Sequence, residues 1–223
     1  MGGAAAYFDL DRTLLAVSSE RRLFSRLVKR KGVLWRTRAL LRQSLCAVGR
    51  MLRGHVPYDA MRSHCYLKGV SADDLEQIVE ELVDEELIRK IPLAARERLE
   101  WHRERGDRIV IVSATLQPIA QRLGEHLGVD AIHAVELPRN AKNRFTGSER
   151  GGRIPRRRGK VSIVQDDATK HDIDLAASWG YGNSAADAWF MRLCGEAMAV
   201  NPDGRLRKEA IARGWSVSVW EIE

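Results

Sequence analysis

The 223-residue sequence predicts an α/β protein, with a parallel β-sheet, helices on both of its faces and a helical insertion early in the chain. Three observations support this fold class. Short apolar runs typical of buried strands alternate with segments of helical periodicity. Residues 19–88, between the first two of these runs, have helical patterns. Polar side chains follow several runs directly, as expected where the strands of a parallel sheet end at a ligand site.

The first predicted strand covers residues 5–10, within the stretch AAAYFDLDRTLLA. Asp9 lies near its end, and Asp11 follows it directly. Residues two apart in a strand point to the same side of the sheet. If the strand continues through Asp11, the two carboxylates therefore converge and repel each other. A cation or a group elsewhere in the chain has to offset that repulsion.

The insertion is predicted from Leu41, Leu45, Val48 and Leu52, which recur at helical spacing, and Pro57 and Gly69 interrupt it. The predicted domains are a core of residues 1–18 and 89–223 and an inserted helical domain of residues 19–88.

The remaining elements follow in order: a helix from Pro92 to Gly106, a strand over 108–115, a helix ended by Gly128, a strand over 130–137, a hairpin or flap over 144–154, a helix around Lys160, a strand over 176–183, a helix after Asp187, a strand over 196–201 and a helix over 203–215.

The formal net charge of +7 is unevenly placed, because residues 21–53 contain no Asp or Glu while residues 72–86 are acidic. One interpretation is two solvated helix faces of opposite sign. Another is a surface that attracts an anionic substrate, an anionic membrane or nucleic acid. The leucines of the basic segment then either pack inside the inserted domain or lie on the membrane. Nucleic acid is not expected as a partner, since the run Arg156–Arg158 suits a basic flank beside a phosphate site.

The cysteines Cys46, Cys65 and Cys194 are widely spaced and show no metal-binding pattern, which favours a reducing compartment. The first strand begins almost at once, so we expect no signal peptide. The segment 33–52 is broken by arginines and does not suit a membrane span. These observations predict a cytoplasmic protein.

Five motifs in order resemble the haloacid dehalogenase-like hydrolase superfamily, and within it the phosphoserine-phosphatase-like branch of subfamily IB. They are FDLDRTL, IVIVSAT, the Lys160 of RRRGK, YGNSAAD and the ending AVNPDGRLRKEAIARGW. The resemblance covers nearly the whole chain. It implies a Rossmann-like parallel sheet and a C1-type helical cap in place of the insertion, and it implies a phosphatase that uses Mg²⁺ as cofactor.

The resemblance also implies roles for individual residues. Asp9 is expected as the nucleophile that forms an aspartyl-phosphate, and Asp11 as the acid and base. Ser113 and Lys160 are expected to bind phosphoryl oxygens. Asp9, Asp11 and Asn183 are expected to bind the metal ion. Asp187 is expected to orient Lys160, and Thr13 to stabilise the turn after the first strand. From the residues alone, Ser113 could instead cap the helix that follows it.

Two departures from the family pattern bear on activity. Arg12 replaces a small residue, and Asn183 stands where the family has a metal-binding aspartate, so one ligand charge is missing. Glu20 lies two residues later than the family's substrate-reading glutamate, which argues against strict phosphoserine specificity. The predicted substrate is a small phosphorylated metabolite or a phospholipid head group. The alternatives are a weakly active or inactive scaffold that binds an anionic surface, and a phosphotransferase.

Overall fold

The computed structural model describes residues 2–54, 63–149 and 155–222, which fall into two compact units. Unit 1 comprises Met1–Ser19, Val83–Val135 and Ile154–Glu223, and unit 2 comprises Glu20–Leu82 and Glu136–Arg153. Unit 1 holds the predicted sheet and unit 2 most of the predicted insertion.

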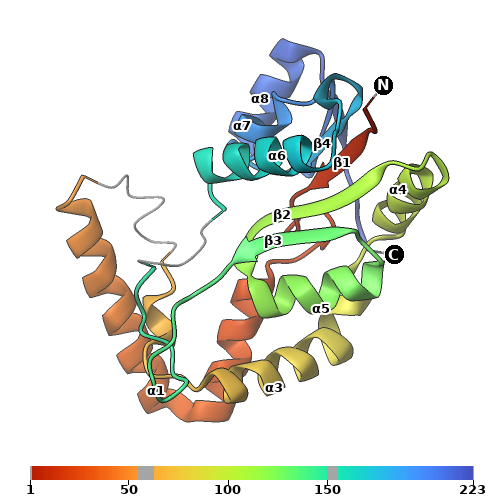
Figure 1. The fold of residues 1–223 in the computed structure, drawn as a ribbon. Coiled ribbons are helices and arrows are strands. Elements are labelled where there is room, and N and C mark those ends of the chain that lie inside the picture. Colours follow the sequence, from red (N-terminus) through yellow and green to blue (C-terminus); the bar gives the residue numbers. More distant parts are fainter. Residues whose placement is uncertain (1, 55–62, 150–154, 223) are drawn as a thin grey trace. The chain divides into compact units, whose positions relative to one another are not determined.

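Unit 1 is built on a six-stranded sheet in the order β3-β2-β1-β4-β5-β6, and every neighbouring pair is parallel (Figure 1). The parallel α/β sheet predicted from the sequence is therefore confirmed. The strands are β1 (Ala5–Phe8), β2 (Arg108–Leu116), β3 (Ala131–Val135), β4 (Trp179–Gly182), β5 (Glu196–Val200) and β6 (Ser216–Ser218). The sequence did not predict β6, because its three residues include two serines and form no apolar run.

Helices cover both faces of the sheet (Figure 1). On one face lie α4 (Leu93–Glu104) and α5 (Gln117–Leu127), and on the other lie α6 (Arg158–Lys170), α7 (Ala188–Met191) and α8 (Gly204–Arg213). The second face forms a core in which Tyr7 of β1 is clustered with Val164 of α6 and Phe190 of α7. Because both faces are covered, all four residues of β1 are fully buried. The predicted end of α5 is also confirmed, since Gly128 adopts the left-handed conformation (φ 63°) that favours glycine.

Unit 2 contains α1 (Ser19–Met51, its first residue in unit 1), a short 3-10 turn (Cys65–Leu67) and α3 (Ala72–Leu82). Within unit 1 the chain then continues through a π-helical turn (Val83–Leu87) and a 3-10 turn (Ile88–Lys90), and a further 3-10 turn (Leu175–Ala177) precedes β4. Gly32 has φ 82° and ψ 175° and divides α1 into two halves. In the first half, Arg30 and Lys31 form ion pairs with acidic residues of α3, at 3.0 Å to Glu81 and 3.1 Å to Asp74. This part of the basic segment thus matches the interpretation of two oppositely charged helix faces.

The segment Glu136–Arg153 belongs to unit 2, although the sequence-based division assigned it to the core. Backbone hydrogen bonds explain the difference: Gly69 N–H donates to the Phe145 carbonyl, and Ala72 N–H donates to the Asn143 carbonyl, both at 2.9 Å. The predicted hairpin over 144–154 extends beyond the described residues. In the described part, an antiparallel bridge joins Arg139 to Phe145, so the chain reverses earlier than expected.

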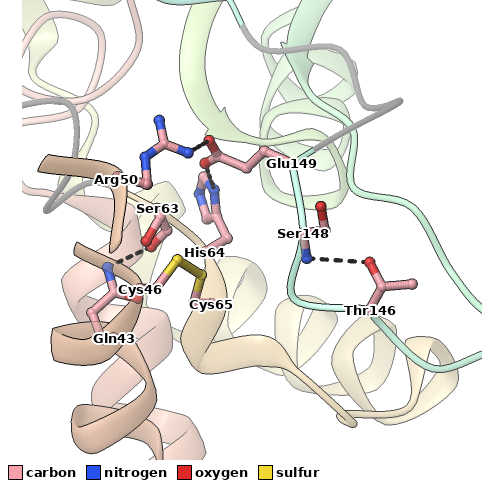
Figure 2. Close-up of a disulfide and its surroundings, with 9 residues drawn as sticks. All are labelled: Gln43, Cys46, Arg50, Ser63, His64, Cys65, Thr146, Ser148 and Glu149. Carbon is pink, nitrogen blue, oxygen red and sulfur yellow. Dashed lines mark hydrogen bonds and ion pairs between the residues drawn. A yellow bond between two sulfur atoms is a disulfide. The ribbon is translucent and has the colours of Figure 1, made fainter. Parts of the chain in front are cut away.

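A disulfide between Cys46 and Cys65 ties the second half of α1 to the 3-10 turn (Figure 2). Beside it, His64 Nδ1 lies 3.2 Å from Glu149, and Arg50 donates to the same carboxylate at 2.7 Å. The free thiol of Cys194 is buried in unit 1. Disulfides are rare in reducing compartments, so the structure does not support the argument for such a compartment from the spacing of the cysteines.

Within the described ranges, none of the helices combines the length and the apolar character that crossing a bilayer requires.

Candidate active site

The register of the sheet gathers the predicted site residues at one edge. Phe8 of β1 pairs with Ile111 of β2 on one side and with Tyr181 of β4 on the other. Asp9 follows Phe8 directly, and Ser113 and Asn183 each lie two residues beyond those pairing partners. All three strands run in the same direction, so these side chains belong to the carboxyl edge of the sheet, where parallel sheets bind their ligands.

Asp11 reaches this region through a turn rather than through a longer strand. The first strand ends at Phe8, and the carbonyl of Leu10 accepts hydrogen bonds from the N–H groups of Thr13 (3.2 Å) and Leu15 (2.9 Å). Arg12 lies in the left-handed region, with φ 61°. The predicted strand over 5–10 is thus too long, and the premise of a strand continuing through Asp11 is wrong. The N–H of Ser19 lies 3.1 Å from each carboxylate oxygen of Asp11 and holds that side chain in place.

Thr13 is fully buried within this turn. Its N–H donates to the Leu10 carbonyl within the turn, whereas its hydroxyl has no hydrogen-bond partner among the described residues.

The centre of the site is a buried lysine between two carboxylates. Lys160 Nζ lies 2.6 Å from Oδ1 of Asp9 and 2.6 Å from Oδ1 of Asp187. All three side chains are buried, with Asp9 the most exposed of them at 6%. The structure therefore brings together the residues that the sequence predicts as nucleophile, phosphate-binding lysine and orienting aspartate.

The electrostatics of this group follow from two acids sharing one base. Burial raises the pKa of Asp9 above its usual range; the charge of Lys160 opposes that shift, and those of Asp187 and Asp11 add to it. Burial alone would lower the pKa of Lys160, but Asp187 and Asp9 outweigh burial and raise it. Lys160 is consequently a cation at neutral pH, held where a phosphoryl group carrying negative charge would meet it.

Asp187 is held by the loop that precedes α7. Its second oxygen, Oδ2, accepts hydrogen bonds from the N–H (3.0 Å) and the hydroxyl (2.7 Å) of Ser184, and the N–H of Asn183 lies 3.3 Å away. Gly182 permits this close approach, because a Cβ there would lie 2.4 Å from the Cβ of Asp187. Reasoning from the sequence missed the roles of Ser184 and Gly182 here and that of Ser19 at Asp11. Ser184 and Gly182 lie within the YGNSAAD motif, where a hydroxyl three residues before an aspartate is a usable signal for such a turn.

Ser113 is buried on β2, and its hydroxyl oxygen accepts a hydrogen bond from the N–H of Thr115 at 3.3 Å. The alternative role as a helix cap is wrong. Leu116 occupies the N-cap position of α5, and no side chain caps that helix end. The proton of this hydroxyl remains available, and it is suited to donation to an oxygen of a bound phosphoryl group.

The residues that could hold a metal ion are Asp9, Asp11 and Asn183, which offer oxygen donors. Hard oxygen donors of this kind fit Mg²⁺. Lys160 bonds to Oδ1 of Asp9, and no described residue donates a hydrogen bond to Oδ2. Among the described residues, no three His, Cys, Asp or Glu side chains cluster as metal ligands. Asn183 contributes a neutral amide oxygen to this set of donors, so the set has one carboxylate fewer than the family pattern.

Comparison with known proteins agrees with this architecture. The sequence model of the family described as haloacid dehalogenase-like hydrolase matches residues 6–192. The "Inhibition of morphological differentiation protein" of Streptomyces azureus is 33% identical over 219 residues, which cover 96% of this chain and 77% of that protein. The phosphoserine phosphatase SerB1 of Mycobacterium tuberculosis (strain ATCC 25618 / H37Rv) is 29% identical, over 98% of this chain and 71% of that protein. The histidinol-phosphatase of Neisseria meningitidis serogroup C (strain 8013) is 28% identical, over 95% and 96%.

Two solved structures extend the comparison to three dimensions. A protein of unknown function from Bordetella pertussis Tohama I superimposes with a TM-score of 0.78 at 26% identity, over 98% of this chain and 99% of that one. A phospho-aspartyl intermediate analogue of phosphoserine phosphatase superimposes with a TM-score of 0.69 at 16% identity, over 100% and 96%, which shows a shared fold. With the family match spanning most of the sequence and including the residues that surround Asp9, the chain belongs to the haloacid dehalogenase-like hydrolase family.

Proposed function

We propose that the chain is a Mg²⁺-dependent phosphomonoesterase that works through an aspartyl-phosphate on Asp9. The observation that supports this proposal most is the buried contact of Lys160 with Asp9 and Asp187 at the carboxyl end of the central strand. A carboxylate and an ammonium in direct, buried contact are suited to attack on a phosphoryl group and to stabilisation of its charge.

In the first half-reaction, a carboxylate oxygen of Asp9 attacks phosphorus, and the bond between phosphorus and the ester oxygen breaks. Asp11 donates a proton to the departing alkoxide, so the alcohol leaves neutral. The ammonium of Lys160 and the hydroxyl of Ser113 bind the oxygens of the transferring group. Asp187 keeps Lys160 in place, because its other oxygen is fixed by Ser184.

In the second half-reaction, Asp11 accepts a proton from a water molecule that attacks the same phosphorus. The bond from phosphorus to Asp9 then breaks, orthophosphate leaves and the Asp9 carboxylate is regenerated. Asp11 suits both steps because Ser19 fixes its position in the turn. When bound by Asp9, Asp11 and Asn183, Mg²⁺ would neutralise the repulsion between the nucleophile and the phosphate dianion.

The proposed substrate class is a small phosphorylated metabolite or a phospholipid head group. Two relatives carry the names phosphoserine phosphatase and histidinol-phosphatase, and the leaving groups in those names are chemically different. This supports a phosphomonoester without selecting its alcohol. The inserted domain as a cap and the cytoplasmic location stay predictions.

Hydrolysis of p-nitrophenyl phosphate, with and without Mg²⁺, tests the proposal. We expect Mg²⁺-dependent release of phosphate that is lost in Asp9→Asn and retained in Asp166→Asn, a matched control at an exposed aspartate of α6. No turnover in the intact protein with Mg²⁺ and a panel of phosphomonoesters would instead favour the inactive-scaffold alternative. Transfer of the phosphoryl group to added glycerol in place of water would identify a phosphotransferase.

A further inference from the structure

The second half of α1 has an exposed apolar face. Five side chains at successive spacings of 7, 4, 3 and 4 residues lie on one side of this helix and its final turn, and they are exposed by 55–84%: Leu34, Leu41, Leu45, Val48 and Leu52. The helical spacing of these residues agrees with the prediction from the sequence. Their packing inside the inserted domain, one of the two interpretations left open, is wrong.

The opposite side of the same helix makes the contacts within unit 2. Ala39 and Ala47 are buried there, Cys46 forms the disulfide, and Gln43 donates to the carbonyl of Ser63 (Figure 2). The helix thus turns small and polar residues toward its own unit and leucines toward solvent. Water-soluble helices normally have the reverse pattern, and a contiguous exposed apolar face marks an interaction site.

The charge on this half of α1 selects the kind of partner. From Arg21 to Arg53 the sequence contains no acidic residue. Arg36, Arg38 and Arg53 are exposed and form no ion pair with any residue that the structure describes, whereas Arg30 and Lys31 of the first half are paired with α3. A second copy of the same face would bring unpaired arginines against arginines, at an electrostatic cost.

We propose that the second half of α1 and the first residue after it, residues 33–52, bind an anionic lipid surface. The leucine face enters the boundary between head groups and acyl chains, and the arginines contact the phosphates of the head groups. An apolar face flanked by basic residues is the pattern of helices that lie in the plane of a membrane interface. This contact is independent of the proposed phosphatase chemistry.

Cosedimentation with vesicles tests the proposal. The intact protein is mixed with phosphatidylcholine vesicles in which about one third of the lipid is phosphatidylglycerol, and with pure phosphatidylcholine vesicles. We expect binding to the anionic vesicles that weakens as salt rises, and little binding to the neutral ones. The double variant Leu41→Ser/Leu45→Ser should lower the partition coefficient by at least about tenfold. The control Ile211→Ser removes an apolar side chain on α8 that is 69% exposed, and it should leave binding unchanged.

Further measurements separate this proposal from its competitors. Arg36→Gln/Arg38→Gln/Arg53→Gln should remove the preference for anionic vesicles. Both multiple variants should keep the circular dichroism and the p-nitrophenyl phosphate activity of the parent, because every substituted residue is exposed. Equal sedimentation of the parent and Leu41→Ser/Leu45→Ser overturns the proposal. A dimer in solution that this variant dissociates, without vesicle binding by the parent, also overturns it and assigns the face to a second copy. If the parent protein binds anionic vesicles but hydrolyses no phosphomonoester, that result contradicts the proposed phosphatase function and leaves the membrane proposal standing.

Discussion

Lys160 Nζ lies 2.6 Å from Oδ1 of Asp9, and both side chains are buried. The nucleophile and the phosphate-binding cation of the proposed mechanism are therefore in direct contact before substrate binds. Incoming phosphate has to share Lys160 with Asp9, so small displacements of the ammonium should affect turnover more than they affect stability.

Asp187→Asn tests whether Asp187 acts through Lys160. The variant removes the charge that holds the ammonium, and misplacement of such a group costs about 10²-fold in kcat. If Asp187 acts only on Lys160, the variant Lys160→Met/Asp187→Asn should be no slower than Lys160→Met alone, which a double-mutant cycle measures. Asp166→Asn is the matched control. Additive losses in the cycle would show that Asp187 has a separate role.

Asp11→Asn should slow both formation and breakdown of the phospho-enzyme, by about 10²–10⁴-fold where proton transfer limits the rate. Rapid-quench measurements with an alkyl phosphate follow both steps. With an aryl phosphate, whose leaving group needs little protonation, the first step should be nearly unaffected while the second stays slow. Normal dephosphorylation in this variant would remove Asp11 from the mechanism.

Asn183→Asp should restore the charge that the family pattern has at this position. We expect the Mg²⁺ concentration for half-maximal activity to fall by about tenfold, since affinity for this cation follows ligand charge. Asn183→Ala, which removes the oxygen, should raise that concentration. Calorimetric titration of Mg²⁺ into the three proteins gives the affinities directly. Identical affinities would show that Asn183 does not contact the metal.

Asp167 on α6 provides a test of stability against pH. It accepts hydrogen bonds from Arg108 at 3.0 Å and from Tyr7 at 3.2 Å. Burial alone would raise its pKa, but contacts with His133 and with the charge of Arg108 hold the pKa well below its usual range. Because the pKa is depressed on folding, the stabilisation is complete above the unfolded value of about 3.9 and is lost as the pH falls further.

The variant Asp167→Asn should therefore lower the free energy of unfolding by about 1.5–3 kcal/mol at pH 7. Its deficit relative to the parent should shrink below about pH 4. Urea unfolding across this range checks both values, and Asp166→Asn should show neither effect. A deficit that does not depend on pH would mean that the changed hydrogen bonds of the amide, and not the lost charge, destabilise the variant.

The sequence was sufficient to predict five of the six strands and the gathering of Asp9, Ser113 and Asn183 at the carboxyl edge of the sheet, because strand alternation and the residues after β1, β2 and β4 carry that information locally. It was not sufficient for Ser19 and Ser184, whose contacts with Asp11 and Asp187 depend on how the following turns close. The extension of β1 to Leu10 failed since an apolar residue between two aspartates fits a strand and a turn equally well.

Unit 2 shows a second limit of reasoning from sequence. The spacing of Leu41 and Leu45 predicts a helix correctly, but periodicity does not state which face of a helix meets the protein. The pairing of Cys46 with Cys65 and the assignment of Glu136–Arg153 to this unit depend on contacts between distant parts of the chain. No local pattern records such contacts.

The most direct test of the central claim is detection of the phosphoryl group on Asp9. Asp11→Asn should accumulate the intermediate with an aryl phosphate, because only its breakdown is then slow. This variant is mixed with p-nitrophenyl phosphate and Mg²⁺, quenched in acid, digested and examined by peptide mass spectrometry. We expect one added phosphoryl group on the peptide that contains Asp9, absent from Asp9→Asn/Asp11→Asn and from samples without substrate. An active parent enzyme that never carries phosphate on Asp9, or carries it on another residue, would contradict the proposed mechanism.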